Sequence, residues 1–159
     1  IKSSTKPACI KALSNFKKDR EMEIWGNNAF KSVATAVKAG SRPNLRALRL
    51  INVDTVDPWD ISRLIGLELE TTLRRIHFKG ATSKALLMAI LKRCQLLEQI
   101  IFESVGKIEF PCDFQFSSSL VSFVSVDTQL DVFAESFTNV AGLLVWFYDG
   151  TRLSFTPPL

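Results

Sequence analysis

Apolar positions recur along the chain in a short phrase of the form L-x-x-L-x-L. The clearest copies are Leu45-x-x-Leu48-x-Leu50, Leu73-x-x-Ile76-x-Phe78 and Leu97-x-x-Ile100-x-Phe102. Weaker copies are Met22-x-Ile24 followed by Asn27, Val140-x-x-Leu143-x-Val145, and Val121-x-x-Val124-x-Val126, for which Leu120 with Phe123 is a competing register. The middle residues of successive phrases lie 19 to 28 positions apart. Recurrence at this period predicts stacked structural repeats.

Helical patterns separate the first phrases. Residues 29–39 place Phe30, Val33 and Val37 on one helical face, and Gly40 supplies a stop. A second helix is expected to begin at Pro58, and a third covers residues 83–93, with inward positions Leu86, Leu87, Ile90 and Leu91. Each unit is therefore predicted to be a short strand followed by a helix. One such unit cannot bury its own apolar face, so several must stack.

The pattern loosens after Val105. We expect residues 106–119 to be irregular and residues 128–138 to carry a short helix with Leu130, Phe133 and Phe137 inward. The chain is predicted to be a single domain. It would begin with a basic N-terminal cap or partial repeat over 1–20, helical at 7–16, and continue with repeats over 21–139. A capping repeat and tail over 140–159 would close it, with aromatic residues at Trp146, Phe147 and Tyr148. Because the first residue is Ile1, we expect the sequence to start inside a longer or processed chain.

A cysteine stands three residues before one clear phrase, in Cys94-Gln95-Leu96-Leu97-Glu98-Gln99-Ile100, which continues to Phe102. The stretch Arg42-Pro43-Asn44-Leu45-Arg46-Ala47-Leu48 is similar, with Arg42 in place of the cysteine. Both stretches resemble the cysteine-containing, ribonuclease-inhibitor-like leucine-rich repeat found in F-box proteins. The family's later Cys or Asn is kept only as Asn27, and no F-box-like segment occurs. The resemblance, which covers about residues 20–150, implies an α/β leucine-rich repeat solenoid. This would be a short horseshoe arc of about five to six repeats, with parallel strands on the concave face and helices on the convex face.

Composition, charge and cysteine content narrow the kind of protein and the cellular compartment that the sequence predicts. The 159 residues are 47% apolar and 23% charged, which excludes a disordered chain. Residues 1–94 carry 18 Lys and Arg against 8 Asp and Glu, whereas residues 95–159 carry 2 against 8, so the net charge of +4 is unevenly distributed. Three cysteines without CxxC spacing and one histidine argue against a zinc site or a disulfide framework. We therefore expect an intracellular protein of the cytoplasm, the nucleus or an organelle matrix, with no membrane association.

No catalytic constellation is evident. The sequence contains no G-x-S-x-G, P-loop or G-x-G-x-x-G motif, and His77 has no partner at a recognisable nucleophile spacing. The prediction is a non-enzyme without metal or cofactor, and Cys94 is expected to be a small buried packing residue.

Recognition through the concave face is the remaining function class. In each phrase the residues between the apolar positions should point away from the core. These surface positions are Glu21, Glu23, Trp25, Ala47, Arg49, Ile51, Arg75, His77, Lys79, Gln99, Ile101 and Glu103, joined by Phe123, Ser125 and Asp127 if the Val121 register holds. Among them, the candidate partner-binding residues are Glu23, Trp25, Arg49, Ile51, Arg75, His77, Lys79 and Ile101. Under one interpretation Glu23 and Arg49 pair across strands and the rest is solvated. Under the favoured one Arg49, Arg75, His77 and Lys79 form a basic centre bordered by exposed Trp25, Ile51 and Ile101.

Three functions follow from this interpretation. The leading hypothesis is a protein–protein interaction module, an adaptor or scaffold. The second is the substrate-recognition part of an F-box-type ubiquitin ligase, as the resemblance implies. The third is a structural subunit of a large ribonucleoprotein or organellar complex, with RNA contact through the basic N-terminus as a secondary role.

Overall fold

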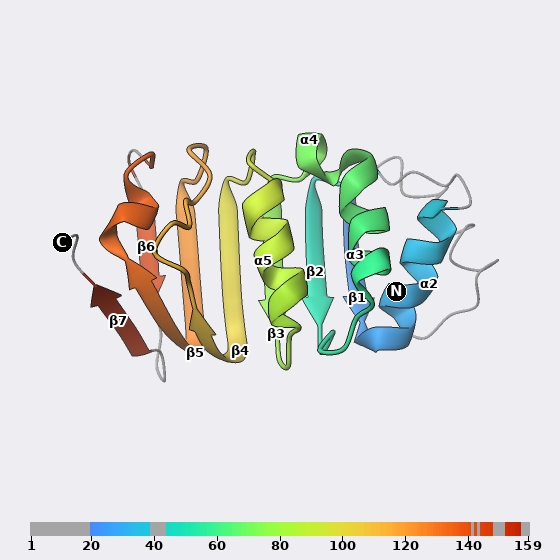
Figure 1. Ribbon diagram of the computed structural model, residues 1–159, viewed down its shortest axis with the longest axis horizontal. Coiled ribbons are helices and arrows are strands. Elements are labelled where there is room, and N and C mark those ends of the chain that lie inside the picture. The colour runs from blue at the N-terminus through green and yellow to red at the C-terminus, as the bar shows by residue number, and fades with distance from the viewer. Residues whose placement is uncertain (1–19, 39–43, 141, 143, 148–151, 157–159) are drawn as a thin grey trace.

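The computed structural model describes residues 20–38, 44–140, 142, 144–147 and 152–156 (Figure 1). Within these ranges, seven strands form one sheet in which every pairing is parallel. The order is β1-β2-β3-β4-β5-β6, with β7 also beside β5. The strands are β1 (Glu21–Trp25), β2 (Ala47–Ile51), β3 (Arg75–Lys79), β4 (Gln99–Glu109), β5 (Ser122–Phe133), β6 (Leu144–Phe147) and β7 (Arg152–Thr156).

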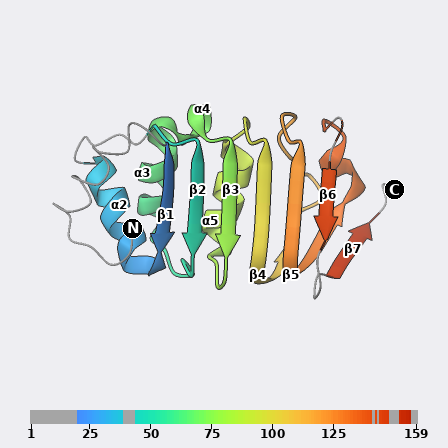
Figure 2. The same cartoon turned by 180° about the vertical axis from the view of Figure 1, so that it is seen from behind.

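The main helices lie together on one face of this sheet, as the two opposite views show (Figures 1 and 2). They are α2 (Gly26–Lys38), α3 (Pro58–Leu64), continued by the π-helical η1 (Ile65–Leu69) and α4 (Glu70–Thr72), and α5 (Lys84–Arg93); a 3₁₀ turn η2 (Ala134–Phe137) follows β5. Asp57 caps α3 before Pro58, and Ser83 caps α5. The α/β class, with parallel strands and helices, is confirmed.

The same backbone features recur at both ends of successive strands. Immediately before the strands, the carbonyl of Arg20 accepts two N–H bonds from residues 46 and 47, and Arg46, Arg74 and Glu98 repeat this arrangement toward the next strand. Immediately after the aligned strand positions, the backbone adopts positive φ at Gly26, Asn52, Gly80, Ser104 and Asp127. The chain therefore makes the same turn five times, which is the structural counterpart of the recurring phrase.

The core lies between the sheet and its cover. The L-x-x-L-x-L positions are buried in every clear copy, and Cys94 is fully buried beside them. From Phe78 onward the core becomes aromatic, with ring contacts linking Phe78, Phe102, Phe110, Phe114, Phe116, Phe123 and Phe137.

Two predictions for the second half of the chain are wrong. Residues 106–109 continue β4 past a bulge instead of starting an irregular segment. Residues 128–133 belong to β5, so only residues 134–137 form the expected short helix, as η2. Leu130 and Val132 are both buried because the segment alternates with period two, and this pattern outweighs the helical spacing of Leu130, Phe133 and Phe137.

The uncertain register at residues 120–127 is also settled. Phe123 and Ser125 are buried, whereas Val124 and Val126 are partly exposed, so the Leu120 register holds and the Val121 register is wrong. Phe123 and Ser125 therefore face the core, and the aligned surface residues are Ser122, Val124 and Val126. The helix expected at 7–16 and the side chains of Trp146, Phe147 and Tyr148 lie outside the described residues.

Candidate protein-binding face

The face of the sheet opposite the helices is crossed by no described helix or loop (Figure 2). We call it the open face. Each of β1 to β4 contributes three residues to it, in a register that aligns them from strand to strand. These residues are Glu21, Glu23, Trp25, Ala47, Arg49, Ile51, Arg75, His77, Lys79, Gln99, Ile101 and Glu103. All eight candidate residues thus lie on the same face, and the alternation of the strands places them there.

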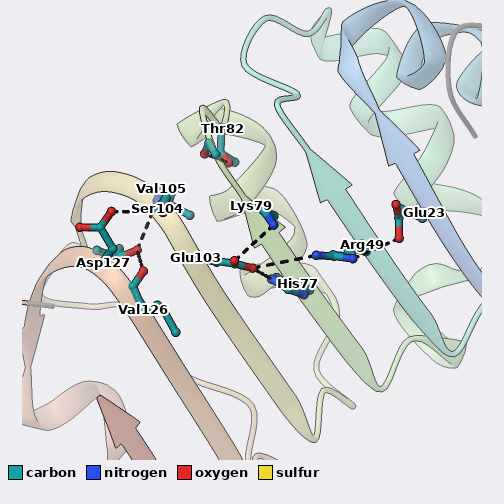
Figure 3. Close-up of polar contacts among 12 residues, drawn as sticks. Glu23, Arg49, His77, Lys79, Thr82, Glu103, Ser104, Val105, Val126 and Asp127 are labelled. Carbon is teal, nitrogen blue, oxygen red and sulfur yellow. Dashed lines mark hydrogen bonds and ion pairs between the residues drawn. The ribbon is translucent and has the colours of Figure 1, made fainter. Parts of the chain in front are cut away.

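Glu103 is the centre of a charged network on this face (Figure 3). It accepts from His77 Nε2 at 3.0 Å and from Lys79 Nζ at 3.3 Å, and Arg49 lies 4.0 Å away. The Arg49 guanidinium also contacts Glu23 at 3.2 Å. Arg49 Nε is buried and has no hydrogen-bond partner among the described residues. The network therefore joins β1, β2, β3 and β4 through one half-exposed arginine.

The surroundings of these groups set their charge states. Burial lowers the pKa of His77, the Arg49 charge lowers it further, and the Glu103 hydrogen bond only partly opposes this. Burial alone would raise the pKa of Glu103, but hydrogen bonds from Lys79 and His77 keep it below its usual value. A hydrogen bond from the Trp25 indole lowers the pKa of Glu23. At neutral pH, His77 is thus neutral and the glutamates are ionised.

A second ion pair bridges two strands that are not neighbours. Arg75 Nη2 lies 2.6 Å from Glu21 Oε1, so the pair reaches from β3 to β1 across Ala47 of β2. The small Ala47 side chain leaves a shallow hollow beneath this pair, walled by Glu23, Arg49 and His77 and by their neighbours on the adjoining strands. Because both partners are about half exposed, the pair contributes little stability and opens easily.

The basic residues expected at the centre of the open face are paired with acidic residues. Arg49, Arg75, His77 and Lys79 do lie together, but each contacts a carboxylate. Two of these carboxylates belong to Glu21 and Glu103, which were expected on this face but were not counted among the partner-binding candidates. The signal was present in the sequence, since both glutamates occupy positions aligned with the candidates.

The apolar border differs from the expectation at one position. Trp25 is 41% exposed, and Ile101 is partly exposed, but Ile51 is only 5% exposed. Ile51 belongs to the open face and is flanked in the sheet by the larger residues Trp25 and Lys79. Val124 and Val126 extend the apolar part of the face instead.

No group of described residues has the arrangement of a metal centre. Among the described residues, no set of three or more His, Cys, Asp or Glu side chains is placed to hold a metal ion. Burial raises the pKa of Cys94 to about 12, which makes its thiol unreactive. Within the described ranges, no helix has the length and apolar character needed to cross a bilayer.

Comparison with known proteins identifies no relative: no family model, no curated protein and no solved structure matches this chain. The interpretation of the open face therefore depends on its own geometry.

Proposed function

We propose that this chain is a leucine-rich-repeat-type protein interaction module that contacts a protein partner through its open face and carries out no chemistry itself. The observation that carries the proposal is the open face itself, a surface of five aligned strands that no described helix or loop covers. It combines a 41% exposed tryptophan with two arginines, and Trp and Arg are the residues most enriched among interface hot spots. The recurring turns and stacked strands support the repeat assignment.

The charged network suits such a surface. Exposed ion pairs are each worth about 1 kcal/mol or less, so a partner's carboxylate or amide can displace Glu21 or Glu23 at small cost. The parallel sheet below fixes the backbone positions of these groups, so a partner meets them in a constant register.

The test compares two charge reversals of equal size. Arg49→Glu/Lys79→Glu places new negative charge beside Glu23 and Glu103, whereas Lys31→Glu/Lys92→Glu makes the same charge change on exposed helix positions. Both variants and the wild type are used for affinity capture from a lysate of the source organism and read by mass spectrometry. We expect a protein that is retained by the wild type and the helix variant and depleted at least about tenfold by the open-face variant.

Equal recovery of every protein by the two variants would contradict the proposal. The identity of the captured protein separates the narrower roles. Ubiquitin-ligase core subunits would favour the substrate-recognition role, and ribonucleoprotein subunits would favour the structural role.

A further inference from the structure

Three arginines form a row along the edge of the sheet where the strands begin. Arg20, Arg46 and Arg74 each stand one residue before β1, β2 and β3. Their backbones are joined directly, because Arg46 N donates to Arg20 O at 2.8 Å and Arg74 N donates to Arg46 O at 2.8 Å. Neighbouring strands lie about 4.8 Å apart. The fold thus repeats one cation at the same position of three successive units, and we call this set the arginine row.

The row differs from the other arginines in its lack of counter-ions. The structure describes the side chains of four further arginines, Arg49, Arg63, Arg75 and Arg93, and each forms an ion pair with a carboxylate. The three arginines of the row form no ion pair with any described residue, and the only side-chain hydrogen bond found for the row is from Arg74 to the carbonyl of Thr71. Arg46 is exposed, and Arg20 and Arg74 are partly exposed. Three aligned like charges that pair with no described carboxylate suit an external anion.

Beyond the row, the same edge carries one carboxylate and two exposed apolar side chains. The next aligned positions are Glu98 before β4 and Val121 before β5. Val121 is 52% exposed, and Leu96, two residues before Glu98, is 38% exposed. These two are among the few large apolar side chains exposed in the described part of the chain. The edge therefore offers cations at β1 to β3 and, on either side of Glu98 in the sequence, the aliphatic side chains of Leu96 and Val121.

The opposite edge of the sheet has the opposite charge. There the segments after the strands carry Asp54, Asp57 and Asp127, all exposed. An acidic partner is thus repelled from one edge and attracted to the other, which orients its approach.

From this arrangement we infer that the arginine row, with Leu96 and Val121, binds an acidic amphipathic segment of a partner protein. The Cβ atoms of helix residues i and i+4 lie about 5–6 Å apart, close to the spacing of the row, so glutamates at these positions can face successive arginines. Arginine pairs with a carboxylate through two parallel hydrogen bonds. A single-stranded nucleic acid is a poorer match, because its bases stack on aromatic rings and the described residues of this edge include none. This site is separate from the open face and does not depend on it.

The experiment measures binding of a fluorescein-labelled peptide of glutamates with a leucine at every fourth position, by fluorescence anisotropy at low ionic strength. The test variant is Arg46→Gln/Arg74→Gln. Its matched control is Lys31→Gln/Lys107→Gln, which removes the same charge elsewhere. We expect affinity to fall at least about tenfold in the test variant and less than about twofold in the control. Far-UV circular dichroism and thermal unfolding show that both variants are folded.

Two comparison probes establish the chemistry of the ligand. An all-glutamate peptide should bind more weakly than the leucine-containing one, and Val121→Ser should remove that difference. An oligo-uridylate of equal charge should bind more weakly than either peptide.

The inference is overturned if the peptide does not bind, if the test and control variants lose affinity equally, or if the oligo-uridylate binds more tightly. Loss of peptide binding in Arg49→Glu/Lys79→Glu, with none in Arg46→Gln/Arg74→Gln, would place the acidic ligand on the open face and would also overturn it.

Discussion

The first half of the sheet, β1 to β3, and the second half, β4 and β5, share the same turn after their aligned strand positions, but different segments then cover the sheet. After β1, β2 and β3, the positive-φ residues Gly26, Asn52 and Gly80 lead into segments that carry helices. After the aligned positions of β4 and β5, Ser104 and Asp127 adopt the same conformation, yet the chain continues as strand to Glu109 and Phe133. In Figure 1 these continuations and β7 lie on the side where α2, α3 and α5 cover the first half.

The residues of the core differ between the two halves in the same way as the segments that cover the sheet. Of the 12 phenylalanines, two precede residue 77 and ten follow it. Helices α2 and α5 pack Val, Leu, Ile and Ala against the sheet, whereas the second half fills the same layer with contacting aromatic rings. The turn is thus common to all units, whereas the hydrophobic periodicity of the segment after it decides whether a helix or an extended strand forms there. The register of the open face is preserved through both halves.

The largest expected effect comes from removing one ring of the aromatic half. Phe116 contacts the rings of Phe110, Phe114, Phe123 and Phe137, so Phe116→Ala should lower the free energy of unfolding by about 3–5 kcal/mol. Phe30→Ala, in α2, removes an equally buried ring from the helical half. Chemical denaturation gives both values, and we expect Phe116→Ala to be worse by about 1 kcal/mol because the ring–ring contacts add to burial.

Hydrogen exchange of the same two variants sharpens this comparison. Phe116→Ala should speed exchange mainly in β4 and β5, and Phe30→Ala mainly in β1 and β2, because each unit packs chiefly on its neighbours. Uniform acceleration across the sheet in either variant would show that the two halves open as one unit.

A smaller effect is expected at the shared turn. Gly80 has φ of +72°, and a Cβ atom there would collide with Asn52 Oδ1, whereas Gly26, with φ of +83°, has no atom within 4 Å of such a Cβ. Gly80→Ala should cost about 2 kcal/mol and Gly26→Ala about 1 kcal/mol, both measured by urea denaturation. A larger loss at Gly26 would contradict the turn geometry described above.

The smallest expected effect is the pH dependence of His77, which joins the halves through Glu103. Because its pKa is lowered in the folded state, the unfolded chain binds the proton more readily, and stability present above the unfolded pKa is lost as pH falls. Between pH 7 and 5.5, wild type should lose more unfolding free energy than His77→Gln. His77 is the only histidine, so the difference between the two reports on it alone. An equal loss in both would show that burial does not disfavour the imidazolium.

The sequence predicted the first four strands and their register, because Leu48, Ile76 and Ile100 stand out in a clear alternation. It did not decide the register of β5, because Phe123 and Val124 are both good strand residues and Ser125, although buried, is a residue type typical of a surface position. The ion pairs were harder still: contact between Glu21 and Arg75 depends on the small size of Ala47 between them. The arginine row, by contrast, could be predicted from the sequence, since Arg46 and Arg74 directly precede two of the clearest strands.

Site-specific photo-cross-linking tests the central claim, that the open face contacts a protein, most directly. A benzoylphenylalanine replaces Ile101 on the open face, or Lys31 on helix α2 as the control, and the irradiated complexes are resolved by mass. We predict a discrete cross-linked protein from position 101 and none from position 31. Cross-linking from position 31 with none from position 101 would contradict the claim and move the binding surface to the helices.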